Sequence, residues 1–206
     1  MERTAKEITS SEGDYSLTIT DFQQMWEQAA AKLGEWKKRG IDTISISVNV
    51  STKDFYYADL YQVFTGLVEK YDINPGLLNI EITETVFMSD MQLHMEVINK
   101  LRAYGFHIEI DDFGSGYTTF GDLQHLDISI VKIDRSITHN SVTDTGFIIL
   151  KNIIQTAHDI GFKTLCEGVE TKEQLDFLQS VDCDMIQGYY FAKPMPIEEF
   201  EEKYKE

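Results

Sequence analysis

The sequence predicts an α/β fold in which parallel strands and helices alternate, as they do in a (β/α) barrel. From residue 43 onward, short β-branched runs alternate with amphipathic helical patterns. One strand and one helix together take roughly 20 to 35 residues, which is the spacing of a parallel sheet wrapped by helices. The chain has 206 residues, three prolines and no low-complexity run, which suits a single compact domain.

Six strand candidates succeed one another along the chain, each a β-branched run with a polar residue near its end. They are residues 43–50, 77–83, 106–112, 128–134, 162–168 and 184–188. A closed (β/α) barrel of the TIM type has eight strands by definition. Residues 14–20, DYSLTIT, offer a short seventh, so the count predicts a barrel that is open or a chain that has lost its beginning.

Amphipathic helices are predicted between these strands. The first runs from about Asp21 to Arg39, and two others are indicated by apolar residues at helical spacing over 93–104 and 150–160. Capping boxes favour helix starts at three pairs of residues: Thr20 with Gln23, Ser89 with Gln92, and Thr171 with Gln174. Glycines stand where left-handed helix ends are expected, at Gly40, Gly105 and Gly161.

The excess of acidic over basic residues limits which molecules the protein is expected to bind. Acidic residues number 35 and basic residues 18, for a formal net charge of −17. Such a field repels nucleic-acid backbones, so we expect no DNA or RNA polymer as a partner.

No apolar run approaches the roughly 18 residues of a membrane span, and residues 1–16 lack the apolar core of a signal peptide. A cytoplasmic location without a membrane segment is the expectation. The two cysteines, Cys166 and Cys183, lack disulfide or metal spacing and are interpreted as small buried residues.

Oxygen or nitrogen side chains stand near the carboxyl end of every strand candidate from residue 43. They are Asn49, Glu81, Asp111 with Asp112, Lys132, Glu167 and Gln187. The carboxyl ends of several strands build the ligand and catalytic sites of (β/α) barrels. We therefore expect these side chains to meet in one barrel mouth.

Four carboxylates in one mouth repel one another. Two charges about 4 Å apart at an effective dielectric near 20 cost on the order of 4 kcal/mol. The cluster therefore needs protons, a lysine or metal ions, and oxygen ligands without thiolates or imidazoles favour Mg²⁺ or Mn²⁺ over Zn²⁺. The predicted chemistry is metal-assisted phosphoryl hydrolysis. For Asp111 and Asp112 the alternative is a strand-end pair that only caps the next loop.

Six segments together carry a resemblance to a known family. They are SVNVS (47–51), IEITET (80–85), DDFGSGYTTF (111–120), VKIDRS (131–136), CEGVET (166–171) and IQGYYFAKPMP (186–196). From about residue 16 to its end the chain resembles the EAL-domain family, bacterial phosphodiesterases that linearise cyclic di-GMP to pGpG. The resemblance implies a modified TIM barrel with one antiparallel strand, of which six or seven of the eight strands are present. Residues 1–15 would be an extension or a truncation remnant, and residues 16–206 the barrel domain.

The resemblance also implies two Mg²⁺ or Mn²⁺ ions and a role for each matching residue. The implied metal ligands are Asn49, Glu81, Asp111, Asp112 and Glu167. Lys132 would contact the catalytic water and the reacting phosphate, beside Asp111 and Glu167. A barrel lysine paired with a carboxylate for stability is compatible with that role.

Further residues are implied to bind substrate or to hold a loop. The implied substrate-binding residues are Gln187, Asp134, Arg135, Phe191 and Pro194. A surface salt bridge is the alternative for Asp134 and Arg135, and core packing is the alternative for Phe191 and Pro194. The implied loop residues are Glu84, Glu170, Gly114 and Gly116. Glu84 would anchor the loop 113–121, which couples dimerisation to metal binding in this family, and its glycines give the loop freedom to move.

The sequence departs from the family at its beginning. The early Glu-Ala-Leu strand, whose Glu binds metal and whose nearby Arg grips phosphate, is absent from the chain. Two functions therefore stay open: a cyclic di-GMP phosphodiesterase with impaired turnover, or a catalytically weak or inactive cyclic di-GMP receptor or protein-interaction module. A homodimer and an upstream regulatory domain are further expectations.

Overall fold

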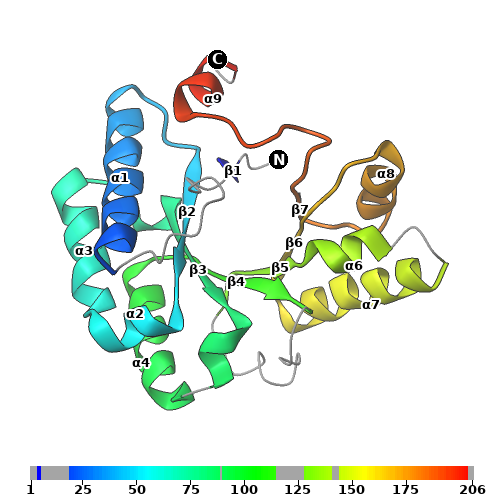
Figure 1. Ribbon diagram of the computed structural model, residues 1–206, viewed down its shortest axis with the longest axis horizontal. Coiled ribbons are helices and arrows are strands. Elements are labelled where there is room, and N and C mark those ends of the chain that lie inside the picture. The colour runs from blue at the N-terminus through cyan, green and yellow to red at the C-terminus, as the bar shows by residue number, and fades with distance from the viewer. Residues whose placement is uncertain (1–3, 6–18, 89, 115–127, 141–143, 204–206) are drawn as a thin grey trace.

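A single parallel sheet forms the centre of the computed structural model, which describes residues 4–5, 19–88, 90–114, 128–140 and 144–203. Its strands lie side by side in the order of the sequence, β1 to β7, and every pairing among them is parallel. Their bounds are β1 Thr4–Ala5, β2 Ser45–Val50, β3 Leu78–Thr83, β4 Ile108–Phe113, β5 Ile130–Ile133, β6 Lys163–Cys166 and β7 Met185–Ile186. The sheet curls as part of a barrel, and the helices lie around its outer face (Figure 1).

All six strands predicted from residue 43 onward are present, but the seventh is not where the pattern placed it. β1 is Thr4–Ala5, which pairs with Ser45 and Ile46 of β2. Of the predicted strand 14–20, Ile19 and Thr20 begin helix α1 (Ile19–Lys38), and residues 14–18 lie outside the described part. β-branched residues are only weakly disfavoured in helices, so the long amphipathic pattern that follows outweighs their local preference.

Helices precede or follow almost every strand. Besides α1 they are α2 Thr52–Tyr57, α3 Leu60–Tyr71, α4 Met91–Tyr104, α6 Arg135–Asn140, α7 Asp144–Ile160, α8 Lys172–Ser180, α9 Ile197–Lys203 and the 3₁₀ turns η1 Pro75–Leu77 and η2 Glu84–Met88. In the part of the chain that the structure describes, no helix has both the length and the apolar character to cross a bilayer.

Two of the three predicted helix starts can be compared with the structure. The box of Thr171 and Gln174 opens α8. The predicted box at Thr20 is wrong, because Thr20 already lies inside α1. Ser89 is outside the described residues, and Asp90 precedes α4 as its N-cap. Gly40, Gly105 and Gly161 have the positive φ angles expected after helices.

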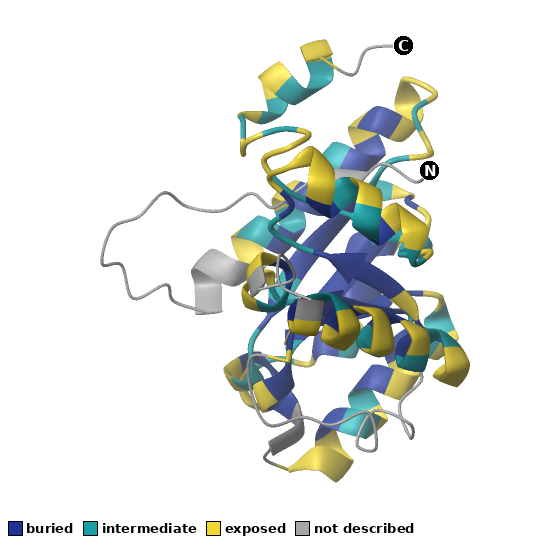
Figure 2. Cartoon of the chain, turned by 90° about the vertical axis from the view of Figure 1, so that its right-hand side faces the viewer, coloured by how far each residue is buried: buried dark blue, intermediate teal, exposed yellow. Residues whose placement is uncertain are grey.

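The hydrophobic core lies between the curled sheet and the inner faces of the helices, as the burial colours of Figure 2 show. In α1 the buried face includes Trp26, Leu33 and Trp36, as the apolar stripe predicts. In α4, however, His94 is buried while Leu93 is 46% exposed. The buried imidazole is compensated by a 2.7 Å hydrogen bond between Nδ1 and the carbonyl of Val86, so a pattern of apolar residues alone places the buried face one residue off.

The last described helix packs against the first. Trp36 Nε1 donates to Glu201 Oε1 of α9 at 2.7 Å, and Arg39 lies 3.0 Å from Glu201 Oε2. The rings of Trp36 and Phe200 lie 6.2 Å apart. α9 therefore joins the C-terminal part of the fold to α1 on the open side of the sheet (Figure 1).

Candidate active site

Five neighbouring strands bring the predicted polar side chains to one end of the sheet. Asn49 on β2 is in register with Glu81 on β3, and Thr83 at the end of β3 is in register with Asp111 on β4. Lys132 lies on β5, and Glu167 directly follows β6. Residues in register on parallel strands face the same side of the sheet, so these side chains share one mouth.

Lys132 occupies the centre of this mouth. Its side chain is only 2% exposed, and its Nζ lies 2.7 Å from Glu81 Oε1, 2.8 Å from Asp111 Oδ1 and 3.1 Å from Glu167 Oε1. Of these three ion pairs, the contact with Glu81 is also a hydrogen bond, which Nζ donates to Oε1. Three carboxylates from three different strands or strand ends thus surround one ammonium group. The positive charge of the lysine holds together acidic groups that would otherwise repel one another.

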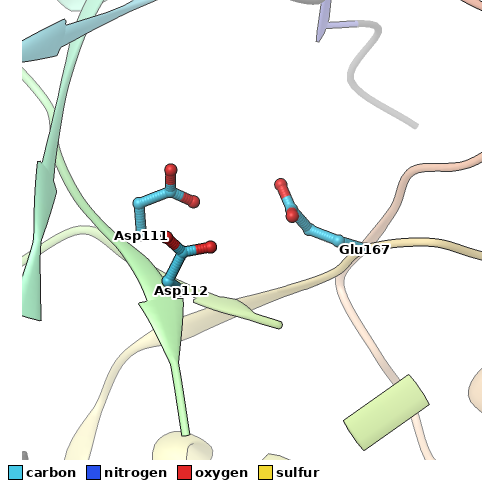
Figure 3. Close-up of side chains that lie close together, drawn as sticks. All are labelled: Asp111, Asp112 and Glu167. Atoms are coloured by element: carbon cyan, nitrogen blue, oxygen red, sulfur yellow. The ribbon is translucent and has the colours of Figure 1, made fainter. Parts of the chain in front are cut away.

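The adjacent aspartates point to the same side because β4 is irregular where they stand. Side chains alternate in a regular strand, which would send Asp111 and Asp112 to opposite faces. Here the register with β5 shifts between Ile110 and Phe113, and Asp112 has a left-handed backbone with φ of 58°. Aspartate tolerates this conformation better than most residues. Both carboxylates consequently face Glu167 (Figure 3).

A set of three oxygen ligands results from this bulge. One carboxylate oxygen from each of Asp111, Asp112 and Glu167 lies within 4.8 Å of the others. Such a spacing allows all three to contact one cation, and hard oxygen donors are typical of Mg²⁺ and Mn²⁺ sites. Glu81 joins this set through the shared Lys132, and Asn49 is the next position around the mouth.

The site carries more negative charge than one ammonium group can compensate. Burial raises the pKa of Glu81 to about 8, although Lys132 acts in the opposite direction. Burial alone would lower the pKa of Lys132, yet the surrounding carboxylates, Glu81 foremost, raise it above its ordinary value. Burial, followed by the charge of Asp111, raises the pKa of Asp112. The carboxylates therefore favour protons or cations, which is the property a divalent metal site requires.

One buried acidic residue of the site was missed from the sequence. Glu109 on β4 is in register with Glu81, is 2% exposed and accepts a 2.7 Å hydrogen bond from Asn79 Nδ2. Burial raises its pKa. The signal was available, because Glu109 and Asp111 are two residues apart on one strand and must share a face. Glu109 therefore lies at the level of Asn49 and Glu81, two residues before Asp111 on β4.

The structure describes the start of the predicted loop and one contact to it. The amide of Gly114 donates to Glu84 Oε1 at 2.8 Å, so the buried carboxylate of η2 holds the chain where β4 ends. Gly114 has a φ of 91°, and a Cβ there would lie 2.3 Å from Ile137 Cδ1. Gly116 lies outside the described residues. Glu170 is exposed, and its Oε1 lies 3.7 Å from His139 Nε2.

The predicted substrate residues fall into two groups, of which the first consists of Gln187 and Asp134. Gln187 follows β7 beside the cluster, since its amide donates to the carbonyl of Cys166, and its side-chain Nε2 is buried without a hydrogen-bond partner among the described residues. Asp134 accepts from the amide of Ser136.

The second group lies at the surface. Arg135, Phe191 and Pro194 are exposed, so core packing does not explain the last two. Phe191 contacts Tyr190 edge to face at 5.4 Å between ring centroids. An exposed aromatic pair of this kind leaves a ring face available to a planar ligand.

Comparisons with known proteins agree on one family. The sequence profile of the EAL domain matches residues 14–194. The signalling protein YkoW of Bacillus subtilis is 32% identical over 177 residues, which cover 85% of this chain and 22% of that protein. The bifunctional diguanylate cyclase/cyclic di-GMP phosphodiesterase MucR of Pseudomonas aeruginosa is 31% identical over 174 residues, which cover 84% of this chain and 25% of that protein.

A solved structure agrees with the sequence comparisons. The PaMucR phosphodiesterase, solved as a complex with c-di-GMP, superposes with a TM-score of 0.83 at 30% identity and covers 88% of this chain and 74% of that chain. The chain thus spans about a quarter of the length of the two curated relatives.

Proposed function

The chain belongs to the EAL-domain family, and from that premise we propose that it hydrolyses one phosphodiester bond of cyclic di-GMP to give pGpG. The observation that carries the proposal is the buried Lys132 held by Glu81, Asp111 and Glu167 at the mouth of the sheet. A cationic donor surrounded by hard oxygen ligands is suited to a phosphodiester and to the cations that accompany it.

Two divalent cations, Mg²⁺ or Mn²⁺, are part of the proposal. When bound, they would neutralise charge on the phosphate oxygens and lower the pKa of the attacking water. The residues proposed to hold them are Asn49, Glu81, Asp111, Asp112 and Glu167. The donor chemistry fits, because Asp111, Asp112 and Glu167 present oxygens within 4.8 Å of one another.

Lys132 would act on the phosphate directly. Three carboxylates surround its Nζ, so it would give up at least one of these ion pairs to donate to a phosphate oxygen or to hold the attacking water. Glu167, with the longest of the three contacts, is the partner that we expect to be exchanged. Glu167 would then be placed to orient the water and to accept its proton.

The remaining residues would position the dinucleotide. Gln187 has a buried Nε2 without a hydrogen-bond partner among the described residues, and this group would donate to a substrate oxygen beside Glu167. Phe191 would stack on a guanine, with Pro194 beside it, and Asp134 and Arg135 would contact the substrate at the edge of the mouth. A cytoplasmic location, a homodimer and an upstream regulatory domain complete the proposal, with Glu84, Glu170, Gly114 and Gly116 coupling the loop to the site.

The first described strand of the sheet favours a second function. β1 consists of Thr4 and Ala5, so it places no carboxylate of its own beside the acidic side chains of the other strands. A site with one carboxylate ligand fewer would bind metal more weakly, while the nucleotide contacts of the other strands stay in place. The chain would then act as a cyclic di-GMP receptor or interaction module.

Product chromatography separates the two functions. The purified chain is incubated with cyclic di-GMP and Mn²⁺, beside a chelated sample and Glu167→Gln. Formation of pGpG that both controls abolish supports the phosphodiesterase. Intact cyclic di-GMP with a folded protein would refute turnover, and calorimetric titration with the dinucleotide then tests the receptor.

A further inference from the structure

A histidine that the proposed hydrolysis does not use is buried between segments that follow two strands of the site. His94 on α4 is fully buried. Its ring packs against the ring of Phe55 on α2 at 4.6 Å between centroids, and edge to face against Tyr56 at 5.4 Å. Its Nδ1 lies 2.7 Å from the carbonyl oxygen of Val86 in η2. His94 therefore contacts both the helix that follows β2 and the 3₁₀ turn that follows β3.

The hydrogen bond to Val86 distinguishes this histidine from an apolar side chain of similar size. A carbonyl oxygen only accepts hydrogen bonds, so Nδ1 of His94 has to carry the hydrogen. Nε2 is buried without a hydrogen-bond partner among the described residues. A leucine would fill a similar volume without burying an unpaired polar atom, which is unfavourable. The property that histidine adds at this position is the donor at Nδ1.

The turn that His94 holds leads directly to the end of β4. Glu84 lies two residues before Val86 in η2, is buried and accepts from the amide of Gly114 at 2.8 Å. Gly114 directly follows β4. Hydrogen bonds within a short 3₁₀ helix have poor geometry, so the position of η2 depends on contacts from outside it. The hydrogen bond from His94 is a contact of this kind.

The other side of the His94 ring has a fixed support. Asp54, which is 1% exposed, accepts from the amide and the hydroxyl of Ser51 at 2.8 and 2.6 Å, so that α2 is capped directly after β2. The hydroxyl of Tyr56 on α2 donates to Oδ2 of Asp90, the N-cap of α4, at 2.5 Å. α2 and the start of α4 are thus joined to each other beside His94.

We propose that His94 is a positioning residue for the candidate metal site. Its Nδ1–H holds η2 in place, so that Glu84 holds the end of the strand that carries Asp111 and Asp112. The effect on metal binding rests on the function proposed above. The effect on the amide of Gly114 does not, because that hydrogen bond belongs to the protein without metal or substrate.

Substitutions of His94 separate the hydrogen bond from the volume. His94→Leu keeps the apolar volume and removes the donor, whereas the side-chain amide nitrogen of His94→Asn replaces Nδ1 as a donor. In the metal-free chain, nuclear magnetic resonance should show the amide hydrogen of Gly114 exchanging about tenfold faster in His94→Leu and at nearly the wild-type rate in His94→Asn. Wild-type protection in His94→Leu, or no recovery in His94→Asn, would overturn the proposal.

Calorimetric titration with Mn²⁺ measures the consequence for the site. His94→Leu should bind Mn²⁺ about tenfold more weakly than the wild-type chain, and His94→Asn should recover most of the affinity. Unchanged affinity in His94→Leu would overturn the proposal. If the wild-type chain itself binds no Mn²⁺, the proposed metal site fails, and the exchange of the Gly114 amide decides the role of His94.

The ring nitrogens of His94 in the wild-type chain provide a measurement that needs no variant. Their resonances should show the hydrogen on Nδ1, and a hydrogen on Nε2 alone would overturn the proposal because Val86 would then have no donor. This measurement and His94→Asn decide the proposal if circular dichroism shows that His94→Leu does not fold. The matched control is His107→Leu, at an exposed histidine before β4, which should change neither the exchange of the Gly114 amide nor the affinity for Mn²⁺.

Discussion

Replacing Lys132 with methionine should destabilise the protein strongly. The substitution keeps the buried aliphatic volume but removes the ammonium that contacts Glu81, Asp111 and Glu167 at 2.7, 2.8 and 3.1 Å. Removing one partner of a buried ion pair costs about 3–5 kcal/mol, because the other partner stays buried without compensation. Domains are stable by about 5–15 kcal/mol in total, so the variant should approach the limit of folding.

The loss should depend on pH in a direction set by Glu81. Its pKa is about 8 in the folded protein and about 4.3 when unfolded, so the folded state binds the extra proton between these values. Stability therefore falls as the pH rises from about 4.3 to about 8 through this group. Without the lysine, the pKa of Glu81 rises further, and the fall should extend to higher pH.

Urea unfolding at several pH values is the measurement, with the double variant Lys132→Met/Glu81→Gln as the partner experiment. At pH values above about 8, high enough to ionise Glu81 in the methionine background, removing its charge should recover part of the lost free energy, by a coupling of about 0.5–3 kcal/mol. Lys151→Met on the exposed face of α7 is the matched control and should change stability by less than about 0.5 kcal/mol. A loss below about 1 kcal/mol for Lys132→Met, or strict additivity with Glu81→Gln at pH values where Glu81 is ionised, would refute the electrostatic reasoning.

Contacts away from the lysine give three further expectations. Glu201→Gln should cost about 1 kcal/mol in urea unfolding above about pH 5, and the difference should vanish as the pH falls towards 2, because the indole hydrogen bond lowers the pKa of Glu201 to about 2. Gly188→Ala should lower the free energy of unfolding by about 1–3 kcal/mol, since its Cβ would lie 2.1 Å from a backbone oxygen. Gly66→Ala, with open space in α3, should raise it by up to about 1 kcal/mol. The reverse order of stability in urea unfolding would contradict this packing. Glu84→Ala leaves the amide of Gly114 without this acceptor and should weaken Mn²⁺ binding in calorimetry while the circular dichroism spectrum is kept; unchanged affinity would rule out a role for this anchor.

The strands could be predicted from the sequence because the strands of a buried parallel sheet consist of nearly continuous β-branched runs. Six such runs are present. β1 could not, since two residues carry no periodicity. The helix face of α4 was misplaced because His94 is buried through a hydrogen bond and not through apolar character. Burial of polar groups depends on partners that are distant in sequence, and a local pattern does not contain them.

The meeting of acidic residues with Lys132 could also be anticipated, since polar residues at the ends of neighbouring parallel strands must converge. The side of the sheet that Asp112 faces could not, because a regular strand would turn it away from Asp111. It is the bulge, with the left-handed backbone of Asp112, that brings both carboxylates towards Glu167. Glu109 was overlooked because it stands near the start of β4, whereas the candidates were sought near the ends of the strands.

The contact between α9 and α1 sets an order for the folding of this chain. Trp36 and Glu201 are 165 positions apart, whereas each parallel strand pair forms between segments that follow one another closely. Contacts of such long sequence separation carry the largest loop-closure cost and are made late. During synthesis, Trp36 could make its contacts with α9 only after almost every described residue has left the ribosome. A change in the fluorescence of Trp36 when α9 docks would therefore report the late contact between α9 and α1 and not the formation of α1 itself.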